Sequence, residues 1–346
     1  MHFTRRSLLK LSGLATGLML SAPYLERAGV AHADDVFTPT HKIQKPPTPL
    51  GRIAIWGVEV FRQPNTQSRL LRTAGRDDLI NLYEQVLGEA VLPNNAVWFK
   101  TDGGYCYSSY VQPVTNTMNV PEPDLAAKAF WAEVSMPFTD SFFAPDTTSE
   151  KGMRLYYSSV FRVIAAQKDE VGRWWYRLQE GVSVGPGPYV RAIDMRRIRP
   201  AELTPLATKA KTKRIDIDLT QQLLTAFEDD KAVMTTIIAS GIGQFFTPKG
   251  KHFVIFKTPT TRMSGGVGAD FYDLPGVPFP TYFTERGAAV HGVYWHNDFG
   301  RPRSHGCVNV PQAAAKWVFR WTQPVPVYAN DKAYGIPGQS TAVNVF

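Results

Sequence analysis

The string Ser304-His305-Gly306-Cys307-Val308-Asn309 holds one of only two cysteines in the 346-residue chain. Upstream of it, Ala288 to Val293 reads as a strand that would fix the place and orientation of His291. The residues between them, Asn297 to Arg303, are turn-rich and long enough to bring the chain back beside that strand. The sequence therefore predicts that Cys307 and His291 meet at one site.

A helix is expected soon after this string. Its apolar face follows the i, i+3, i+4, i+7 spacing of Ala314, Trp317, Val318 and Trp321. Asn309 is available as the cap of this helix and Pro311 stands in its first turn. Because the N-terminal end of a helix stabilises negative charge, and a neighbouring imidazole adds to this, we expect Cys307 to favour the thiolate.

A cysteine paired with a histidine is the minimal set for acyl transfer through a thioester. In this interpretation Cys307 is the nucleophile and His291 the general base. Gly306 lets the backbone approach a substrate closely, so the N–H groups of Gly306 and Cys307 are candidates for stabilising an oxyanion. His296 is expected at the surface or at the rim of the substrate site rather than in the reacting pair.

Two alternative roles for this cluster stay open. The side chains of His291, His296, His305 and Cys307 are all possible metal ligands, although their spacing matches no familiar zinc pattern. Alternatively, Cys307 is a buried, inert cysteine near satisfied histidines. An inert cysteine leaves the Ser-His-Gly-Cys turn without a reason.

The first 33 residues read as a cleavable signal peptide. Arg5 and Arg6 precede a short apolar run, and Ala31-His32-Ala33 is a small-residue cleavage site. The twin arginines resemble a twin-arginine export signal, and the general secretory route stays open as an alternative. The apolar run is too short to span a bilayer, so we expect no stable membrane insertion after cleavage. Residues 34–50 are Pro-rich and predict an extended linker.

Two sections of short strands follow, at residues 51–114 and 151–205. Trp98 and Tyr110-Val111 in the first are echoed by Trp175 and Tyr189-Val190 in the second, which suggests two copies of one small barrel. Both sections resemble bacterial SH3-type modules, which implies a role in binding wall polymer. In the alternative, these aromatic residues only form the core of a β-domain. Residues 115–150 are expected to be a connector, with a short helix around residues 125–134.

A third unit begins at Lys213 with clean alternation of apolar and polar residues, which predicts a half-buried strand. We place this β-rich unit at residues 213–329 and treat 330–346 as a C-terminal tail. The stretch from Ser264 to Pro280 is rich in glycine and proline and is predicted to be a loop over the site. Cys106 follows Tyr105 in a predicted strand, where burial is expected.

Composition excludes several classes of protein. At 44% hydrophobic and 20% charged residues, the chain is neither disordered nor fibrous, and two cysteines cannot form a disulfide framework. The net charge of +8 is scattered, with no run that resembles a nucleic-acid-binding arm. Removal of residues 1–33 leaves 34 basic and 29 acidic residues, so the net charge falls to about +5. We therefore expect no nucleic-acid partner.

The C-terminal unit resembles the L,D-transpeptidases of bacterial cell walls. The matching residues are His291-Gly292, then Cys307 sixteen positions later in its Ser-His-Gly-Cys-Val-Asn string, together with Ser240-Gly241 and Thr247-Pro248-x-Gly250 upstream. Where a tighter Gly-Thr-Phe is common in the family, Gly250 is here followed by Lys251-His252-Phe253. The implied fold class is mainly β: a β-sandwich-like catalytic domain preceded by the two SH3-like barrels.

The resemblance implies that Cys307 attacks a peptidoglycan stem tetrapeptide at the carbonyl joining its third residue to the terminal D-Ala. His291 would be the base, and an amine of a second stem would complete a 3→3 crosslink. Ser304 and His305 would shape the turn and the pocket, Asn309 would steady the turn or the substrate, and Gly292 would line the substrate site. Tyr282 is a candidate for the substrate lid. The family also implies inactivation by carbapenem acylation and no metal or organic cofactor.

Two alternatives share these features. An L,D-carboxypeptidase would use the same residues and differ only in passing the acyl group to water. A catalytically inactive scaffold would bind the wall through the aromatic modules alone. In each case we expect an exported protein, in the periplasm or the extracytoplasmic cell wall, whose partners are peptidoglycan stem peptides and wall polymer.

Overall fold

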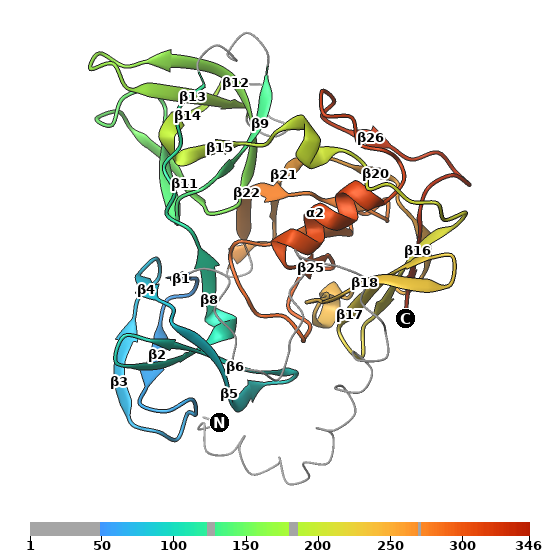
Figure 1. The fold of residues 1–346 in the computed structure, drawn as a ribbon, viewed down its shortest axis with the longest axis horizontal. Coiled ribbons are helices and arrows are strands. Elements are labelled where there is room, and N and C mark those ends of the chain that lie inside the picture. The colour runs from blue at the N-terminus through green and yellow to red at the C-terminus, as the bar shows by residue number, and fades with distance from the viewer. Residues whose placement is uncertain (1–48, 123–128, 180–185, 269–270) are drawn as a thin grey trace.

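The computed structural model describes residues 49–122, 129–179, 186–268 and 271–346 (Figure 1). The residues expected to form a signal peptide, 1–33, and nearly all of the expected linker, 34–50, therefore lie outside the described residues. Strands account for 48% of the structure, and the described part of the chain contains a single α-helix. No helix in these ranges has the length and apolar character needed to cross a membrane. The mainly β class expected from the sequence is confirmed.

The N-terminal unit, residues 50–114, contains eight strands in two sheets of order β4-β1-β8 and β3-β2-β7-β6-β5. Trp98, Phe99 and Cys106 are buried in its core: Trp98 and Phe99 are consecutive and point to opposite faces of their sheet, so Phe99 packs in one cluster with Cys106 and Trp98 in another. Its elements are β1 (Leu50–Ile53), β2 (Val58–Phe61), β3 (Leu70–Ala74), β4 (Leu79–Asn81), β5 (Glu84–Leu92), β6 (Asn95–Thr101), β7 (Gly104–Tyr107), the 3-10 helix η1 (Ser108–Tyr110) and β8 (Val111–Val114).

The middle unit, residues 130–203, is one seven-stranded sheet of order β11-β10-β14-β13-β12-β9-β15. Its elements are β9 (Phe130–Val134), β10 (Phe138–Phe142), β11 (Lys151–Tyr156), β12 (Val160–Lys168), β13 (Trp174–Gln179), β14 (Pro186–Arg191), η3 (Ala192–Asp194), β15 (Met195–Arg197) and η4 (Pro200–Leu203). The expected connector at 115–150 thus supplies two strands of this sheet. The helix expected around 125–134 is wrong over residues 130–134, which form strand β9, and its residues 125–128 lie outside the described residues.

The two units repeat one order of elements. In each, two hairpins precede a further strand, a one-turn 3-10 helix and a closing strand that pairs with the first strand of the unit. The register sets Phe99 opposite Cys106 and Tyr176 opposite Val190. Tyr189-Val190 therefore corresponds to Tyr105-Cys106 and not to Tyr110-Val111, because six residues separate β13 from β14 and only two separate β6 from β7.

The C-terminal unit, residues 213–346, contains two five-stranded sheets, a separate hairpin and the helix α2 (Figure 1). The sheet orders are β18-β17-β16-β27-β19 and β25-β24-β23-β20-β26, and the hairpin is β21-β22. The elements are β16 (Lys213–Asp218), β17 (Leu223–Glu228), β18 (Lys231–Ile237), η5 (Gly243–Phe245), β19 (Gly250–Phe253), β20 (Phe256–Lys257), β21 (Thr260–Gly265), β22 (Tyr272–Pro278), β23 (Thr281–Tyr282), β24 (Ala289–Gly292), β25 (Val308–Val310), α2 (Gln312–Trp321), β26 (Ala333–Tyr334) and β27 (Ala342–Val345).

The last residues of the chain are not a tail. Strand β27 lies between β16 and β19, pairing parallel to the first and antiparallel to the second. Its alternate residues Val343 and Val345 are buried in the core of the unit. The boundary expected at residue 329 is therefore wrong, because a short strand with only two inward side chains gives little local signal.

The middle and C-terminal units share a hydrophobic core. Trp131, Val160, Ile198 and Leu203 of the middle unit are buried in one cluster with the strands and the helix of the C-terminal unit. The indole Nε1 of Trp131 donates a 2.8 Å hydrogen bond to the carbonyl of Tyr328. These two units consequently form one folded body, since separating them would expose apolar surface on both.

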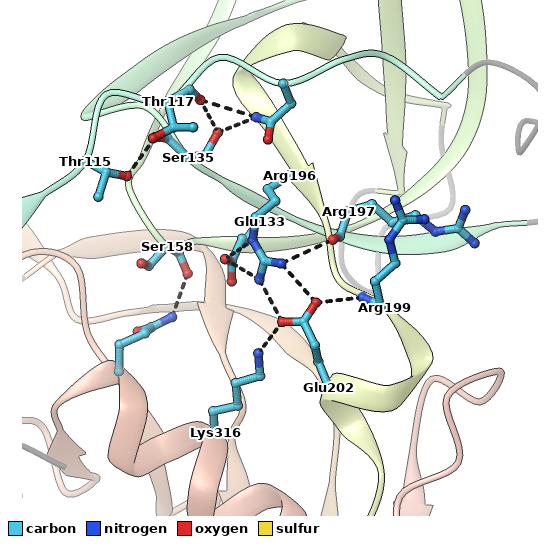
Figure 2. A network of polar contacts seen from close by, with 12 residues as sticks. Thr115, Thr117, Glu133, Ser135, Ser158, Arg196, Arg197, Arg199, Glu202 and Lys316 are labelled. Carbon is cyan, nitrogen blue, oxygen red and sulfur yellow. Dashed lines mark hydrogen bonds and ion pairs between the residues drawn. The ribbon is translucent and has the colours of Figure 1, made fainter. Parts of the chain in front are cut away.

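A network of charged residues connects the middle unit to helix α2 beside this shared core (Figure 2). The carboxylate of Glu202 in η4 accepts from Arg196 of β15 at 2.9 Å for each oxygen and from Lys316 of α2 at 2.8 Å. Arg196 also reaches Glu133 of β9. Partial burial acts to raise the pKa of Glu202, but these cations outweigh it and hold that pKa at about 2. The network ties the middle sheet to the helix that follows the Cys307 string.

Candidate active site

Strands β24 and β25 bring the two predicted catalytic residues together. They pair in parallel, with His291 in register with Asn309 and Val290 with Val308. All four residues of β24 are buried, which fixes the backbone around His291. Residues in register across a sheet project from the same face, so the imidazole and the Asn309 side chain share one face, and Cys307 immediately precedes β25.

The thiol of Cys307 lies against the beginning of β24. Its Sγ donates to the carbonyl of Gly287 at 3.7 Å, and the backbone N–H of Ala289 donates to the sulfur. Burial raises the pKa of this thiol to about 11, and the N–H of Ala289 opposes the rise only in part. At neutral pH the resting side chain is therefore the thiol.

The expected stabilisation of a thiolate by the helix is wrong for this arrangement. Strand β25 stands between Cys307 and α2, and Pro311, not Asn309, occupies the cap position. Asn309 is part of β25, and its backbone exchanges hydrogen bonds with Ala239 at 2.9 and 3.0 Å. The dipole of the helix acts mainly within its first turn, which begins five residues after Cys307.

His291 is almost fully buried and neutral. Its exposed fraction is 2%, and burial lowers its pKa to about 4. The ring Nδ1 lies 2.9 Å from the carbonyl oxygen of Gly292. Because a carbonyl only accepts, Nδ1 carries the proton and Nε2 keeps a free lone pair. This is the tautomer that a general base requires.

Ser304 closes the turn that carries Cys307. Its hydroxyl donates to the carbonyl of Cys307 and accepts from the backbone N–H of Gly306 at 3.2 Å. Gly306 has a φ of +111°, a conformation that only glycine adopts at little cost. The Gly306 N–H, an oxyanion candidate, is thus occupied by Ser304 in the resting structure.

The upstream residues Ser240-Gly241 lie beside this turn. The carbonyl of Ser240 accepts from the N–H groups of Arg303 and Ser304 at 2.7 and 2.9 Å. A Cβ on Gly241 would stand 2.0 Å from the carbonyl oxygen of Phe245, so only glycine fits there. Thr247 locks the loop by accepting from the Gly241 N–H at 2.9 Å. These residues shape the Cys307 turn from the opposite side.

His305 points outward and belongs to an aromatic cluster. Its exposed ring lies 4.5 Å from the ring of Phe245 and 4.9 Å from that of Tyr272, measured between centroids. His305 therefore forms part of the rim of the site rather than of the reacting pair.

His296 lies in the interior, which corrects its expected place at the surface or the substrate rim. It is 2% exposed, and its Nδ1 accepts from the backbone N–H of Asp298 at 3.0 Å. Its Nε2 lies 2.9 Å from the side-chain Nδ2 of Asn309. Polar residues in a turn-rich segment suggest exposure, but here a buried polar network accommodates the ring.

The expected loop over the site is a hairpin. Strands β21 and β22 pair from Thr260 with Pro278 to Gly265 with Tyr272. Burial is the main cause that raises the pKa values of Tyr272 and Tyr282, and both lie close enough to the sulfur of Cys307 for a thiolate there to raise them further. Tyr282 also stacks on Phe256, with centroids 4.2 Å apart. Sequence reasoning found Tyr282 and missed Tyr272, whose signal was its place inside the Gly/Pro-rich stretch.

Gly292 lies in a packed interior position. A Cβ there would stand 2.5 Å from Oε1 of Gln312 and 2.9 Å from Cγ of Pro278. Close packing between β24 and the start of α2 therefore explains why residue 292 is a glycine. Gly292 is buried and does not lie on a surface that a substrate could touch. Within the described ranges, no three His, Cys, Asp or Glu side chains are grouped as metal ligands.

Comparison with known proteins assigns the C-terminal segment. Residues 212–335 match the YkuD family model, the L,D-transpeptidase catalytic domain. No curated protein matches the chain. This segment is therefore an L,D-transpeptidase catalytic domain, and it contains every residue of the site described above.

Solved structures give weaker likenesses. A mutant of the Enterococcus faecium L,D-transpeptidase is 24% identical, with 40% of this chain and 50% of that one covered and a TM-score of 0.31. An L,D-transpeptidase from Xylanimonas cellulosilytica is 27% identical, with 41% and 64% covered and a TM-score of 0.28. One from Mycobacterium smegmatis is 15% identical, with 52% and 98% covered and a TM-score of 0.33. The chain thus spans only half the length of the Enterococcus structure, and the family match carries the assignment.

Proposed function

We propose that this protein is an exported peptidoglycan L,D-transpeptidase that forms 3→3 crosslinks through an acyl-enzyme on Cys307. The observation that carries the proposal is the pairing of β24 with β25, which sets a buried imidazole with a free Nε2 beside the cysteine turn. The family match of residues 212–335 supports the same reaction. The chemistry needs no metal or organic cofactor, because thiol and imidazole supply both the nucleophile and the proton transfer.

In the first step, Sγ of Cys307 attacks the carbonyl carbon between the third stem residue and the terminal D-Ala. His291 Nε2 takes the thiol proton as the C–S bond forms and passes it to the D-Ala nitrogen as the C–N bond breaks. D-Ala leaves as the free amino acid, and the donor stem remains as a thioester. The N–H groups of Cys307 and Gly306 stabilise the oxyanion, the second once Ser304 releases it.

In the second step, a side-chain amine of another stem attacks the thioester carbonyl. His291 accepts a proton from the amine, and the thiolate that leaves is reprotonated, so the enzyme returns to its resting state. An L,D-carboxypeptidase would follow the same first step and admit water in the second. The choice between them depends on which acceptor reaches the thioester.

The resting pair must be activated by the substrate. A thiol of pKa about 11 and an imidazole of pKa about 4 do not exchange a proton at neutral pH. A bound peptide that displaces the Sγ contact to Gly287 turns the thiol toward the ring, and the proton then moves as the C–S bond forms. The reaction is general-base catalysis and not attack by a preformed thiolate.

The rim of the site supplies substrate contacts. Tyr282 and Tyr272 line one side of the sulfur and act as the substrate lid, and His305 forms the outer edge. Ser304 and Asn309 hold the turn and the adjacent strand. Gly292 acts on the substrate site only indirectly, through packing.

The rest of the chain would place this chemistry at the wall. Residues 1–33 are proposed as a signal peptide of the twin-arginine type and 34–50 as a linker. The units at 51–114 and 151–205 are proposed as SH3-like modules that contact wall polymer. Export to the periplasm or the extracytoplasmic wall follows from the substrate.

The decisive experiment supplies the purified mature protein with disaccharide tetrapeptides and identifies the products by mass spectrometry. Crosslinked dimers that lack one D-Ala are expected from the wild type and none from Cys307→Ala. Tripeptide without dimers would replace the transferase with the carboxypeptidase. No product, together with no carbapenem adduct on Cys307, would leave only the inactive scaffold.

A further inference from the structure

The segment that joins the two catalytic residues is held from outside by the N-terminal unit. Residues 293–303, here called the connecting segment, run from the end of the His291 strand to the turn of Cys307. Tyr294, Asn297 and Gly300, spaced three residues apart, each hydrogen-bond to the N-terminal unit. This unit lies more than 180 residues earlier in the sequence, so the contacts are a product of the fold alone.

Arg52 makes the most buried of these contacts. Its side chain is 1% exposed in β1, where Nη1 pairs with Asp77 at 2.8 Å and Nε and Nη2 donate to Gln112 at 3.2 and 2.8 Å. Nη2 also donates to the carbonyl of Tyr294 at 2.6 Å, and the guanidinium covers the ring of Tyr156 at 4.2 Å. One cation thus fixes a backbone oxygen three residues after His291.

Tyr294 links Arg52 to the β21-β22 hairpin that lies over the site. Its hydroxyl donates to the carbonyl of Pro275 in β22 at 2.7 Å, and its ring stacks on Tyr156 of the middle unit. The residue is 2% exposed. A displacement of the Tyr294 backbone would therefore move both the end of β24 and the strand that carries Tyr272.

Two further contacts fix the middle of the connecting segment. The backbone N–H and side-chain Nδ2 of Asn297 donate to the carbonyls of Ser109 and Ser108 in η1, at 3.1 and 3.2 Å. Asn94 Nδ2 donates to the carbonyl of Gly300 at 2.9 Å. A Cβ on Gly300 would stand 3.0 Å from Cβ of Asn94, so these two segments of the backbone are in close contact there.

Inside the segment, a buried network leads on to the cysteine strand. Asp298 is fully buried and pairs with Arg301 and Arg303. Its N–H holds His296, whose other nitrogen meets Asn309 in β25. The connecting segment is therefore held by the N-terminal unit on one side and linked to β25, the strand that follows Cys307, on the other.

We propose that the N-terminal unit is a positioning element for catalysis and that Arg52 is its principal positioning residue. This proposal rests on the proposed function of Cys307 and His291. It adds that the N-terminal unit sets the alignment of these two residues through its hydrogen bonds to the connecting segment. Arg52 touches no reacting atom. It acts by holding Tyr294, and through Tyr294 the end of β24 and the hairpin.

The test measures the rate at which a carbapenem acylates Cys307, followed by intact mass, in the full mature protein. Arg52→Met is expected to lower the maximal acylation rate roughly 10- to 100-fold, since a misplacement of about 1 Å costs this much. The carbapenem concentration at half-maximal rate should change less than the maximal rate, because Arg52 itself does not contact the ligand and reaches the hairpin only through Tyr294. Arg52→Lys, which keeps the charge, should recover part of the rate.

Arg154→Met is the matched control. Arg154 also pairs with Asp77, at 3.1 Å, but it makes no hydrogen bond to the connecting segment. Its loss tests whether disturbing the ion pairs of Asp77 is enough to slow acylation. An Arg52→Met protein that melts within a few degrees of Arg154→Met yet acylates as fast as that control would overturn the proposal.

Asn94→Asp keeps the test decisive if Arg52→Met does not fold. Asn94 has a φ of +60°, which aspartate tolerates, and the exchange turns the donor to Gly300 into an acceptor. The variant should acylate several-fold more slowly with an unchanged half-maximal concentration, and an unchanged rate would contradict the proposal. A folded wild type that forms no adduct would instead refute the function of Cys307, which keeps the two failures apart.

Discussion

Asn309 and His296 meet in the interior, with Nδ2 and Nε2 2.9 Å apart, although the turn that carries Cys307 separates them in the sequence. His296 and His291 are both buried, and burial lowers both pKa values below the ordinary 6.5, that of His291 to about 4. The unfolded chain therefore binds protons in a range where the folded chain resists them. Through these two residues, the free energy of unfolding is highest above pH 6.5 and decreases as the pH falls below it.

We predict that the free energy of unfolding falls by about 2.5 kcal/mol between pH 7.5 and pH 4.5 through His291 alone, whose pKa drops from 6.5 to about 4, and further through His296. Urea denaturation at the two pH values measures the difference. His296→Gln should reduce the pH dependence, because it removes one of the two buried rings. Equal pH dependence in the wild type and this variant would contradict the assignment to buried histidines.

The thiol pKa gives a second prediction. With a pKa of about 11, alkylation of Cys307 by iodoacetamide should accelerate close to tenfold per pH unit from pH 7 to pH 10. A preformed thiolate–imidazolium pair would give a flat profile over the same range. The rate is read from the mass of the adduct, and Cys307→Ala supplies the background, because Cys106 is buried with its pKa raised to about 12.

The sequence predicts this candidate site because its key residues lie within one short stretch. His291, Ser304 and Cys307 are spaced so that one strand, one return segment and one turn bring them together, and glycine at 306 marks the unusual backbone. The thiolate prediction failed because a three-residue strand separates Cys307 from the helix. Such a strand has too few residues to show a period.

What sequence reasoning missed depends on contacts between distant segments. Trp131 lies in the segment expected to be a connector with a short helix, but its ring completes the core of the C-terminal unit. Strand β27 lies in the expected C-terminal tail, and its pairing with β16 joins residues more than 120 positions apart, which no local pattern reports. Local periodicity reports which side chains are buried, but not against which partner.

The shared core predicts that Trp131→Ala destabilises the whole C-terminal unit. Trp131 is 3% exposed, and truncation leaves a cavity and an unpaired Tyr328 carbonyl, so the expected loss is about 3–5 kcal/mol. Trp56→Ala is the control, because that side chain is 83% exposed and should change stability by no more than about 0.5 kcal/mol. Thermal and urea unfolding of both variants would show the contrast, and similar losses in the two would count against a joint core.

Lys257 stabilises the C-terminal end of α2 from a neighbouring strand. It is fully buried in β20, and its Nζ donates to the carbonyls of Phe319 and Thr322 at 2.6 Å each and to the Thr322 hydroxyl at 3.1 Å. The last carbonyls of a helix have no partners within it, and the negative end of the helix favours a cation. Burial nevertheless lowers the pKa of this lysine.

Lys257→Met should therefore cost about 2–4 kcal/mol, because it leaves buried carbonyls without donors, a loss larger than the gain from removing a buried charge. Lys332→Met is a matched control. Lys332 is exposed, and its ammonium lies over the ring of Phe256, the residue that precedes Lys257 in the sequence. Helical circular dichroism and urea unfolding measure the effect. A Lys257→Met protein as stable as Lys332→Met would mean that water satisfies the end of α2 and that the lysine is dispensable there.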